Sequence, residues 1–125
     1  SDLSEESRKL LERIGRFNPG LADGIMRDMK ELRSSDREDV MKVLIKKIES
    51  GDIESNVYSL LFVNFSDYRG EIIDAIKRAA KPLEAGDLPS FKAMYSEDKD
   101  AIENLLNELK NVKQEIKDRI MKTGD

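Results

Sequence analysis

Residues 57–65 read Val-Tyr-Ser-Leu-Leu-Phe-Val-Asn-Phe and form the most apolar stretch of the chain. Their β-branched and aromatic side chains are typical of a strand, and nine residues is an ordinary strand length. The sequence offers no second strand to pair with this one, and an unpaired strand would leave its backbone N–H and C=O groups without partners. We therefore predict that this stretch is a helix, apolar on every side and central in the core.

The other apolar residues recur with the period of an amphipathic helix. Leu10 and Ile14 mark a first helix that Gly15 ends, and Asn18-Pro19 has the pattern of an N-cap followed by a first-turn proline. The sequence thus predicts an all-α fold: a compact bundle or short solenoid of about six to seven helices, arranged as helical hairpins with a long C-terminal helix. Five residues are expected in its core: Leu44, Leu61, Phe62, Ile76 and Leu105.

Length and composition limit the function. The chain has 125 residues, 38% of them hydrophobic and 38% charged, which suits a single domain, 1–125, with a real core. It contains no His, Cys or Trp. This composition excludes most zinc, haem and iron–sulfur sites, thiol nucleophiles and histidine bases, so we expect no metal, no cofactor and no enzyme activity.

A serine followed by an acidic residue marks the start of four predicted helices, at intervals of 31, 31 and 30 residues. The pairs are Ser4-Glu5, Ser35-Asp36, Ser66-Asp67 and Ser96-Glu97; Ser35 also forms a capping-box pattern with Glu38. Two turns that are expected to stop helices also match, since residues 48–55 read IESGDIES and residues 83–90 read LEAGDLPS. The spacing predicts hairpin units 4–34, 35–65 and 66–95 and a closing helix 97–122. Coincidence is the alternative, because Ser and Asp are common at helix starts.

Residues 35–95, with a helix, a Gly-Asp turn and a second helix in about 31 residues, resemble the short HEAT-type helical repeats. The resemblance is weaker in the third unit, where the first helix is longer and the second shorter. It implies a scaffold that binds other macromolecules, usually proteins. It assigns no site residue.

The closing helix has a seam at alternating spacings of three and four residues. The seam residues are Ile102, Leu105, Leu109, Val112 and Ile116. Beyond Leu109 the seam is narrow and flanked by charges, so this half could pair with a partner protein or with a second copy of the chain. The alternative is an ordinary helix packed within the domain.

Aromatic residues at helical spacing supply two more interface candidates. Tyr58 and Tyr68 are expected in the core, but either one, if partly exposed, would be a natural hot spot for protein binding. The complete set of candidate interface residues is Tyr58, Tyr68, Leu109, Val112 and Ile116.

Six basic residues form the alternative hypothesis, a nucleic-acid contact. They are Lys46, Lys47, Arg69, Lys77, Arg78 and Lys81, and they would form one stripe if the first helices of two units were neighbours. Acidic residues interleave with them, and the net charge of the chain is −4. A solvated face with internal ion pairs is therefore the favoured interpretation of these residues.

Patterns typical of catalysis or metal binding have simpler explanations. Residues 96–99 match the Ser-x-x-Lys pattern of serine hydrolases, but the companion motifs are missing and Ser96 suits an N-cap. Glu49/Asp52 and Glu84/Asp87 could hold a hard cation, yet both aspartates suit caps of the helices that follow.

The function predicted from the sequence is a non-enzymatic protein–protein interaction module or a small subunit of a larger assembly. The alternative is a nucleic-acid-binding subunit of a nucleoprotein complex. No apolar run approaches 18 residues, so we expect no membrane contact, and the absence of a signal peptide favours the cytoplasm.

Overall fold

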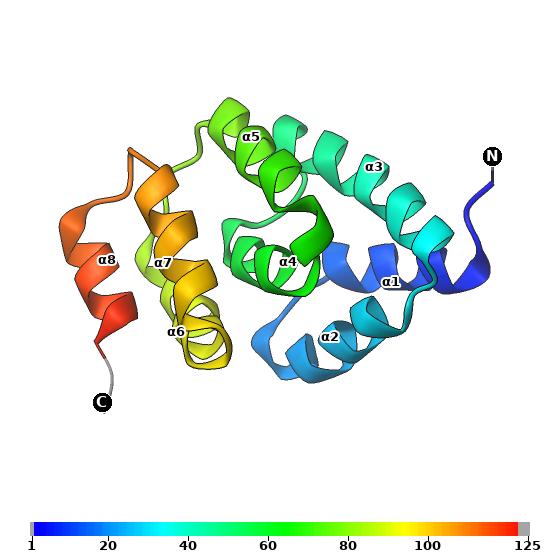
Figure 1. Cartoon of the computed structure of the whole chain (residues 1–125), viewed down its shortest axis with the longest axis horizontal. Coiled ribbons are helices and arrows are strands. Elements are labelled where there is room, and N and C mark those ends of the chain that lie inside the picture. The colour runs from blue at the N-terminus through cyan, green and yellow to red at the C-terminus, as the bar shows by residue number, and fades with distance from the viewer. Residues whose placement is uncertain (1, 123–125) are drawn as a thin grey trace.

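The computed structural model of the chain describes residues 2–122 and is built from eight α-helices joined by turns, with no strand among those residues (Figure 1). The helices are α1 Glu5–Gly15, α2 Ala22–Glu31, α3 Ser34–Ser50, α4 Tyr58–Asn64, α5 Arg69–Ala79, α6 Leu88–Glu97, α7 Lys99–Glu108 and α8 Gln114–Met121. Four short 3₁₀ turns precede α2, α4, α5 and α6. The all-α prediction is confirmed, with eight helices in place of the expected six to seven.

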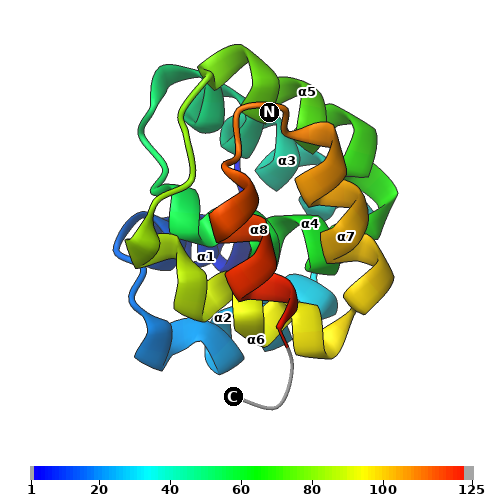
Figure 2. The ribbon, with the colours of Figure 1, turned by 90° about the vertical axis from the view of Figure 1, so that its left-hand side faces the viewer.

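Helices pack mainly against the helix two places away in the chain. α3 lies against both α1 and α5, and α4 lies against both α2 and α6 (Figures 1 and 2). α6 continues the second row by packing on α8, and α7 packs on both α4 and α6. α4 therefore lies at the centre, with α2, α5, α6 and α7 around it.

Residues 57–65, whose composition is typical of a strand, form the central helix α4 and its two flanking residues. α4 buries six of its seven residues, and Val63 is half-buried. Phe62 and Phe65 are completely buried, one within α4 and the other directly after it. The prediction of a helix apolar on all sides is confirmed, as is the burial of the five expected core residues.

Some predicted helix ends are confirmed. The Ser4 hydroxyl accepts a hydrogen bond from the Ser7 amide at 3.1 Å, and the Asn18 side chain accepts one from the Gly20 amide at 3.0 Å. Gly51 ends α3 in the left-handed conformation, with φ of 80°, which glycine adopts without steric cost.

Other predicted ends are wrong. α3 begins at Ser34, one residue before the expected cap, so the capping box of Ser35 and Glu38 does not form. Ser66 lies in a 3₁₀ turn without a side-chain cap. α5 ends at Ala79, followed by Ala80 in the left-handed conformation, so Gly86 stops no helix and lies in a 3₁₀ turn.

The predicted closing helix 97–122 is also wrong, because this segment divides into α7 and α8. Ser96 lies in the last turn of α6, and the Asp98 carboxylate caps α7 by accepting from the Ala101 amide at 3.1 Å. A second break separates Leu109 from Gln114. A straight helix would have left the narrow seam beyond Leu109 in water, whereas the break turns Val112, Ile116 and Ile120 into the core.

The first three predicted units correspond closely to pairs of helices. Unit 4–34 contains α1 and α2, unit 35–65 contains nearly all of α3 and all of α4, and unit 66–95 contains α5 and most of α6. The remaining pair, α7 and α8, takes the place of the single closing helix.

Candidate functional site

Arg37 of α3 connects α2, α4 and the turn before α5 at one point. Its guanidinium donates to the Met29 carbonyl at 2.7 Å, to the Asn64 carbonyl at 3.0 Å and to the Asp67 carboxylate at 2.6 Å. It also lies over the Phe65 ring, 4.5 Å from the centroid. Arg37 thereby satisfies carbonyls at the ends of α2 and α4 and ties the start of α3 to the turn before α5.

Arg69 makes the equivalent connection at the start of α5. It donates to the Phe62 carbonyl at 2.8 Å, lies over the Phe62 ring at 5.1 Å and pairs with Asp98 at 3.3 Å. We call the Arg37–Asp67 and Arg69–Asp98 contacts the two arginine joints. They recur along the chain, since the sequence separations are 30 and 29 residues.

The ion pair in the first joint shifts the pKa of both partners. The hydrogen bond from Arg37 holds the pKa of Asp67 below its usual value, and the same bond raises the pKa of Arg37. The sequence analysis missed Arg37 and named Arg69 only among the candidate nucleic-acid contacts. The signal that could have found them is an arginine near the start of the second and third units with an aspartate 30 or 29 residues later.

The joints and a second ion pair make α3 and α5 parallel neighbours. Arg37 and Asp67 meet near the N-terminal ends of the two helices, and Arg78 Nε donates to Glu49 Oε2 at 2.6 Å near the C-terminal ends. The outward face between the two helices is consequently held at both ends.

A hollow of about 470 Å³ runs along this face. We call it the α3–α5 groove; it is lined by Glu38, Met41, Lys42, Ile45, Lys46, Glu49, Tyr68 and Glu71. Its floor is apolar, formed by buried Met41 and half-buried Ile45 and Tyr68, and its rim is charged. Except for Tyr68 and Glu71, every lining residue comes from one stripe of α3.

The rim charges differ in how far they are neutralised. Glu49 forms an ion pair with Arg78 of α5. Glu38 forms only an exposed ion pair with Lys42, at 3.5 Å within α3. Lys46 and Glu71 have no ion pair with any residue in the described range 2–122. An exposed pair within one helix contributes little energy, so four rim charges remain available to a partner.

Tyr68 lies at the acidic end of the groove. Loss of solvent around its phenol raises its pKa, and Glu38, Asp67 and Glu71 raise it further. A half-buried tyrosine with a neutral hydroxyl offers a large flat contact surface at low conformational cost.

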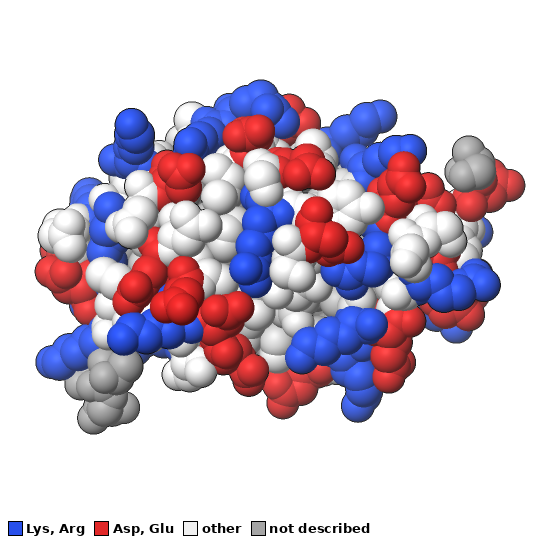
Figure 3. All heavy atoms as spheres, in the orientation of Figure 1, with Lys and Arg blue, Asp and Glu red and all other residues white. Residues whose placement is uncertain are grey.

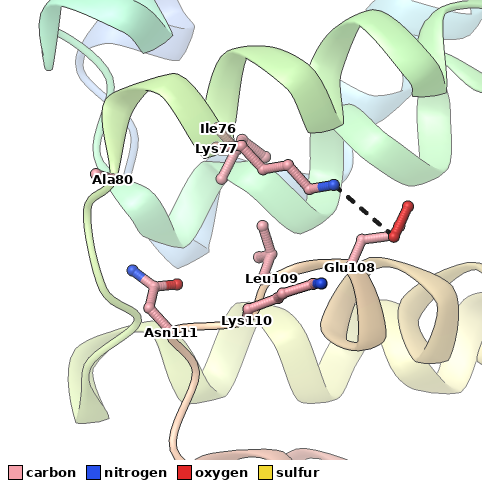
Figure 4. A pocket seen from close by; sticks show the side chains of 7 residues that line it. All are labelled: Ile76, Lys77, Ala80, Glu108, Leu109, Lys110 and Asn111. Atoms are coloured by element: carbon pink, nitrogen blue, oxygen red, sulfur yellow. Dashed lines mark ion pairs between the residues drawn. The ribbon is translucent and has the colours of Figure 1, made fainter.

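A second hollow, of about 340 Å³, lies where α5 and α7 end (Figure 4). Leu109 points from the chain after α7 toward α5, and the rim is closed by an ion pair between Lys77 and Glu108 at 3.8 Å (Figure 4). This hollow lies beside the C-terminal segment, whose helices α7 and α8 pack mainly on α6 and α4.

The structure buries four of the five candidate interface residues inside the chain. Tyr58 is 0% exposed, and its hydroxyl has no hydrogen-bond partner in the part of the chain that the structure describes. Leu109, Val112 and Ile116 are 4–8% exposed. Of the two interpretations left open for the seam, the structure therefore agrees with the packed one, and Tyr68 is the candidate that lies half-buried in the α3–α5 groove.

The six candidate nucleic-acid residues do not form an open stripe. Arg69, Arg78 and Lys77 are paired with Asp98, Glu49 and Glu108, as the favoured interpretation expected. Lys46 and Lys81 are exposed, and Lys47 is half-buried. Positive and negative side chains are intermingled over the face that Figure 3 shows.

The residues of the suspected catalytic and metal-binding patterns make hydrogen bonds that stabilise helices and turns. The Ser96 hydroxyl donates to the Lys92 carbonyl at 3.3 Å instead of capping a helix. Asp87 accepts from the Glu84 amide and the Ser55 hydroxyl, both at 2.8 Å, so it closes the turn before α6; Asp52 accepts from Ser50. Within residues 2–122 no cluster of three metal-ligating side chains occurs, and no helix is long and apolar enough to span a bilayer.

The chain matches no protein-family model, and neither a search of curated proteins nor a search of solved structures finds a match. Its function is therefore inferred from the residues and the geometry alone. The α3–α5 groove combines a partly exposed apolar floor with unneutralised rim charges, which are the properties of a binding surface.

Proposed function

We propose that the protein is a non-enzymatic interaction module that binds another protein surface through the α3–α5 groove. The observation that carries the proposal is the apolar floor of Ile45, Met41 and Tyr68 between two parallel helices, surrounded by charges. An apolar centre with a polar rim is the usual composition of a protein–protein interface.

The shape of the groove favours a helix as the bound element. Its α3 wall extends from Glu38 to Glu49, about 16 Å at the rise of an α-helix. A partner helix of about three turns would place apolar residues over Ile45 and Met41, and the flexible thioether of Met41 adapts to different side chains. Tyr68 would contact the same helix at one end.

The packing of alternate helices supports a short solenoid of helical hairpins, of which the groove would be one outer face. The two arginine joints support the same interpretation, because they repeat the same contact between successive units. Extended surfaces of this kind are suited to binding macromolecules, as the HEAT-type resemblance of residues 35–95 implies.

Site-specific photo-crosslinking tests the proposal, with a crosslinking amino acid at Lys42 and, as control, at Lys9. The two lysines are well matched, since each is 70% exposed in its side chain and each pairs with a glutamate four residues earlier. We expect protein adducts from Lys42 that disappear when Ile45→Glu is added to the same chain. Equal adducts from Lys9, or adducts from Lys42 that survive Ile45→Glu, would contradict groove binding.

A further inference from the structure

We propose that the partner in the α3–α5 groove is a second copy of the chain, whose own α3 lies antiparallel in the groove. This inference rests on the proposed function and goes beyond it by naming the partner. It follows from the order of charges along the groove.

The acidic and basic rim residues follow a definite order along the groove. On α3, Glu38 lies toward the end marked by Tyr68, and Lys42 and Lys46 follow toward the other end. The ion pairs Arg37–Asp67 and Glu49–Arg78 set the register of the two helices, which places Glu71 of α5 opposite Met41 and Lys42. Since Arg78 neutralises Glu49, the groove offers the charges of Glu38, Glu71, Lys42 and Lys46.

The order of these rim residues along α3 is complementary to the same order on a second copy that runs in the opposite direction. In an antiparallel arrangement Glu38 faces Lys46 of the second copy, and Met41 faces Ile45 of the second copy. The first pairing centres on Lys42 and the second on Val43, one residue further along α3, so the two-fold axis would pass close to both. A two-fold interface requires this relation, because each contact between two residues must occur twice with the roles exchanged.

The remaining groove residues fit the same arrangement. Glu71 of one copy lies on the α5 side of the groove, where it meets Lys42 of the other copy. Tyr68 lies at the level of Glu38, so the stem and ammonium of Lys46 from the second copy pack on its ring. A partner with a different sequence would not require the rim of the groove to carry acidic and basic residues that match each other.

Sedimentation of the intact chain tests the inference with two single charge reversals, Glu38→Lys and Lys46→Glu. We expect the wild type to dimerise and each variant alone to bind itself about tenfold more weakly, since each replaces two exposed attractive contacts with repulsive ones. Mixing the two variants restores both contacts in the heterodimer, so the mixture is expected to associate about as tightly as the wild type.

Two controls keep the result specific. Glu5→Lys makes the same charge reversal at an exposed i,i+4 pair on α1 and is expected to leave the dimer unchanged. Circular dichroism of every variant establishes that the fold is retained, as expected for substitutions of exposed side chains.

A wild type that is monomeric at every concentration overturns the inference, and so does a dimer indifferent to both reversals or a mixture that does not recover. Failure here leaves the proposed function standing if Lys42 still gives groove-dependent adducts with another protein. If those adducts are also absent, the proposed function fails as well.

Discussion

α3 and the C-terminal segment both carry amphipathic stripes, yet the fold uses them in opposite ways. α3 is a single helix of 17 residues, and its stripe from Glu38 to Glu49 faces the α3–α5 groove, with charged residues exposed and Ile45 half-buried. The segment after Glu97 is divided into α7 and α8, and its apolar seam is buried.

The difference arises from the helices and ion pairs that each segment contacts. α3 lies between α1 and α5 and is tied by Arg37 near its start and by Glu49 near its end, so it stays straight whether or not its outer stripe is covered. The C-terminal segment has helices on one side only. Breaking the helix costs a few backbone hydrogen bonds but removes three large apolar side chains from water, which is the larger effect. Amphipathic spacing alone therefore does not show which stripe remains exposed.

The largest expected effect tests whether the C-terminal seam is interior. Val112→Glu/Ile116→Glu places two charges at buried positions and is expected to lower the free energy of unfolding by roughly 4 kcal/mol or more. Urea denaturation measures the loss. The matched control is Asn107→Glu/Asn111→Glu, which adds the same charge at exposed positions and should cost less than about 1 kcal/mol. Equal effects of the two doubles would place the seam on the surface.

The next effect concerns the joints that keep α3 straight. Arg37→Ala leaves two helix-end carbonyls and Asp67 without their donor, and we expect a loss of about 2–3 kcal/mol in the same assay. Arg33→Ala is the control, because Arg33 is 79% exposed and makes only a long contact with Asp36. If both substitutions cost the same, the Arg37 joint contributes nothing beyond a surface charge.

A smaller effect appears as a pH dependence of the same joint. Arg37 lowers the pKa of Asp67 in the folded state, so the pair stabilises the fold above the ordinary aspartate pKa of about 4. That stabilisation is lost as pH falls through the lowered folded-state pKa. Urea midpoints from pH 7 downward should therefore fall more steeply for the wild type than for Asp67→Asn. Parallel curves would remove Asp67 from the acid sensitivity of the fold.

The smallest expected effect on stability completes the comparison. Ile45 is half-buried on the outer stripe of α3, so Ile45→Glu should lower the midpoint of thermal unfolding only slightly, corresponding to about 1 kcal/mol. Binding in the groove should nonetheless be lost, because a carboxylate would replace the centre of its apolar floor. A variant that unfolds would show that Ile45 belongs to the core, as Val112 does.

Local patterns predicted much of the fold. The helical period predicted α1, α2, α3 and α5, and the absence of a second strand correctly assigned residues 57–65 to a helix. The serines at 31-residue spacing fall near the starts of α3 and α5, although Ser35, Ser66 and Ser96 cap none of the helices predicted for them. Helical periodicity depends on neighbours within a few turns, which is the range that sequence patterns describe well.

The breaks before and after α7 and the two arginine joints could not be predicted from local sequence patterns. The heptad seam beyond Leu109 is compatible with a straight helix, and only the presence of a core to fold back on favours the break. Arg37 and Asp67 are 30 residues apart, so their contact depends on α3 and α5 being neighbours. For the groove, Tyr68 was anticipated, whereas Met41 and Ile45 read as ordinary positions of an amphipathic helix.

The first arginine joint is also largely contained in one continuous stretch of the chain. Residues 37–67 contain its arginine, its aspartate and the Asn64 carbonyl, and that carbonyl belongs to the backbone and is independent of side-chain identity. A mutation that changes Asn64 would therefore leave this acceptor in place, whereas a change of either charged partner removes the ion pair.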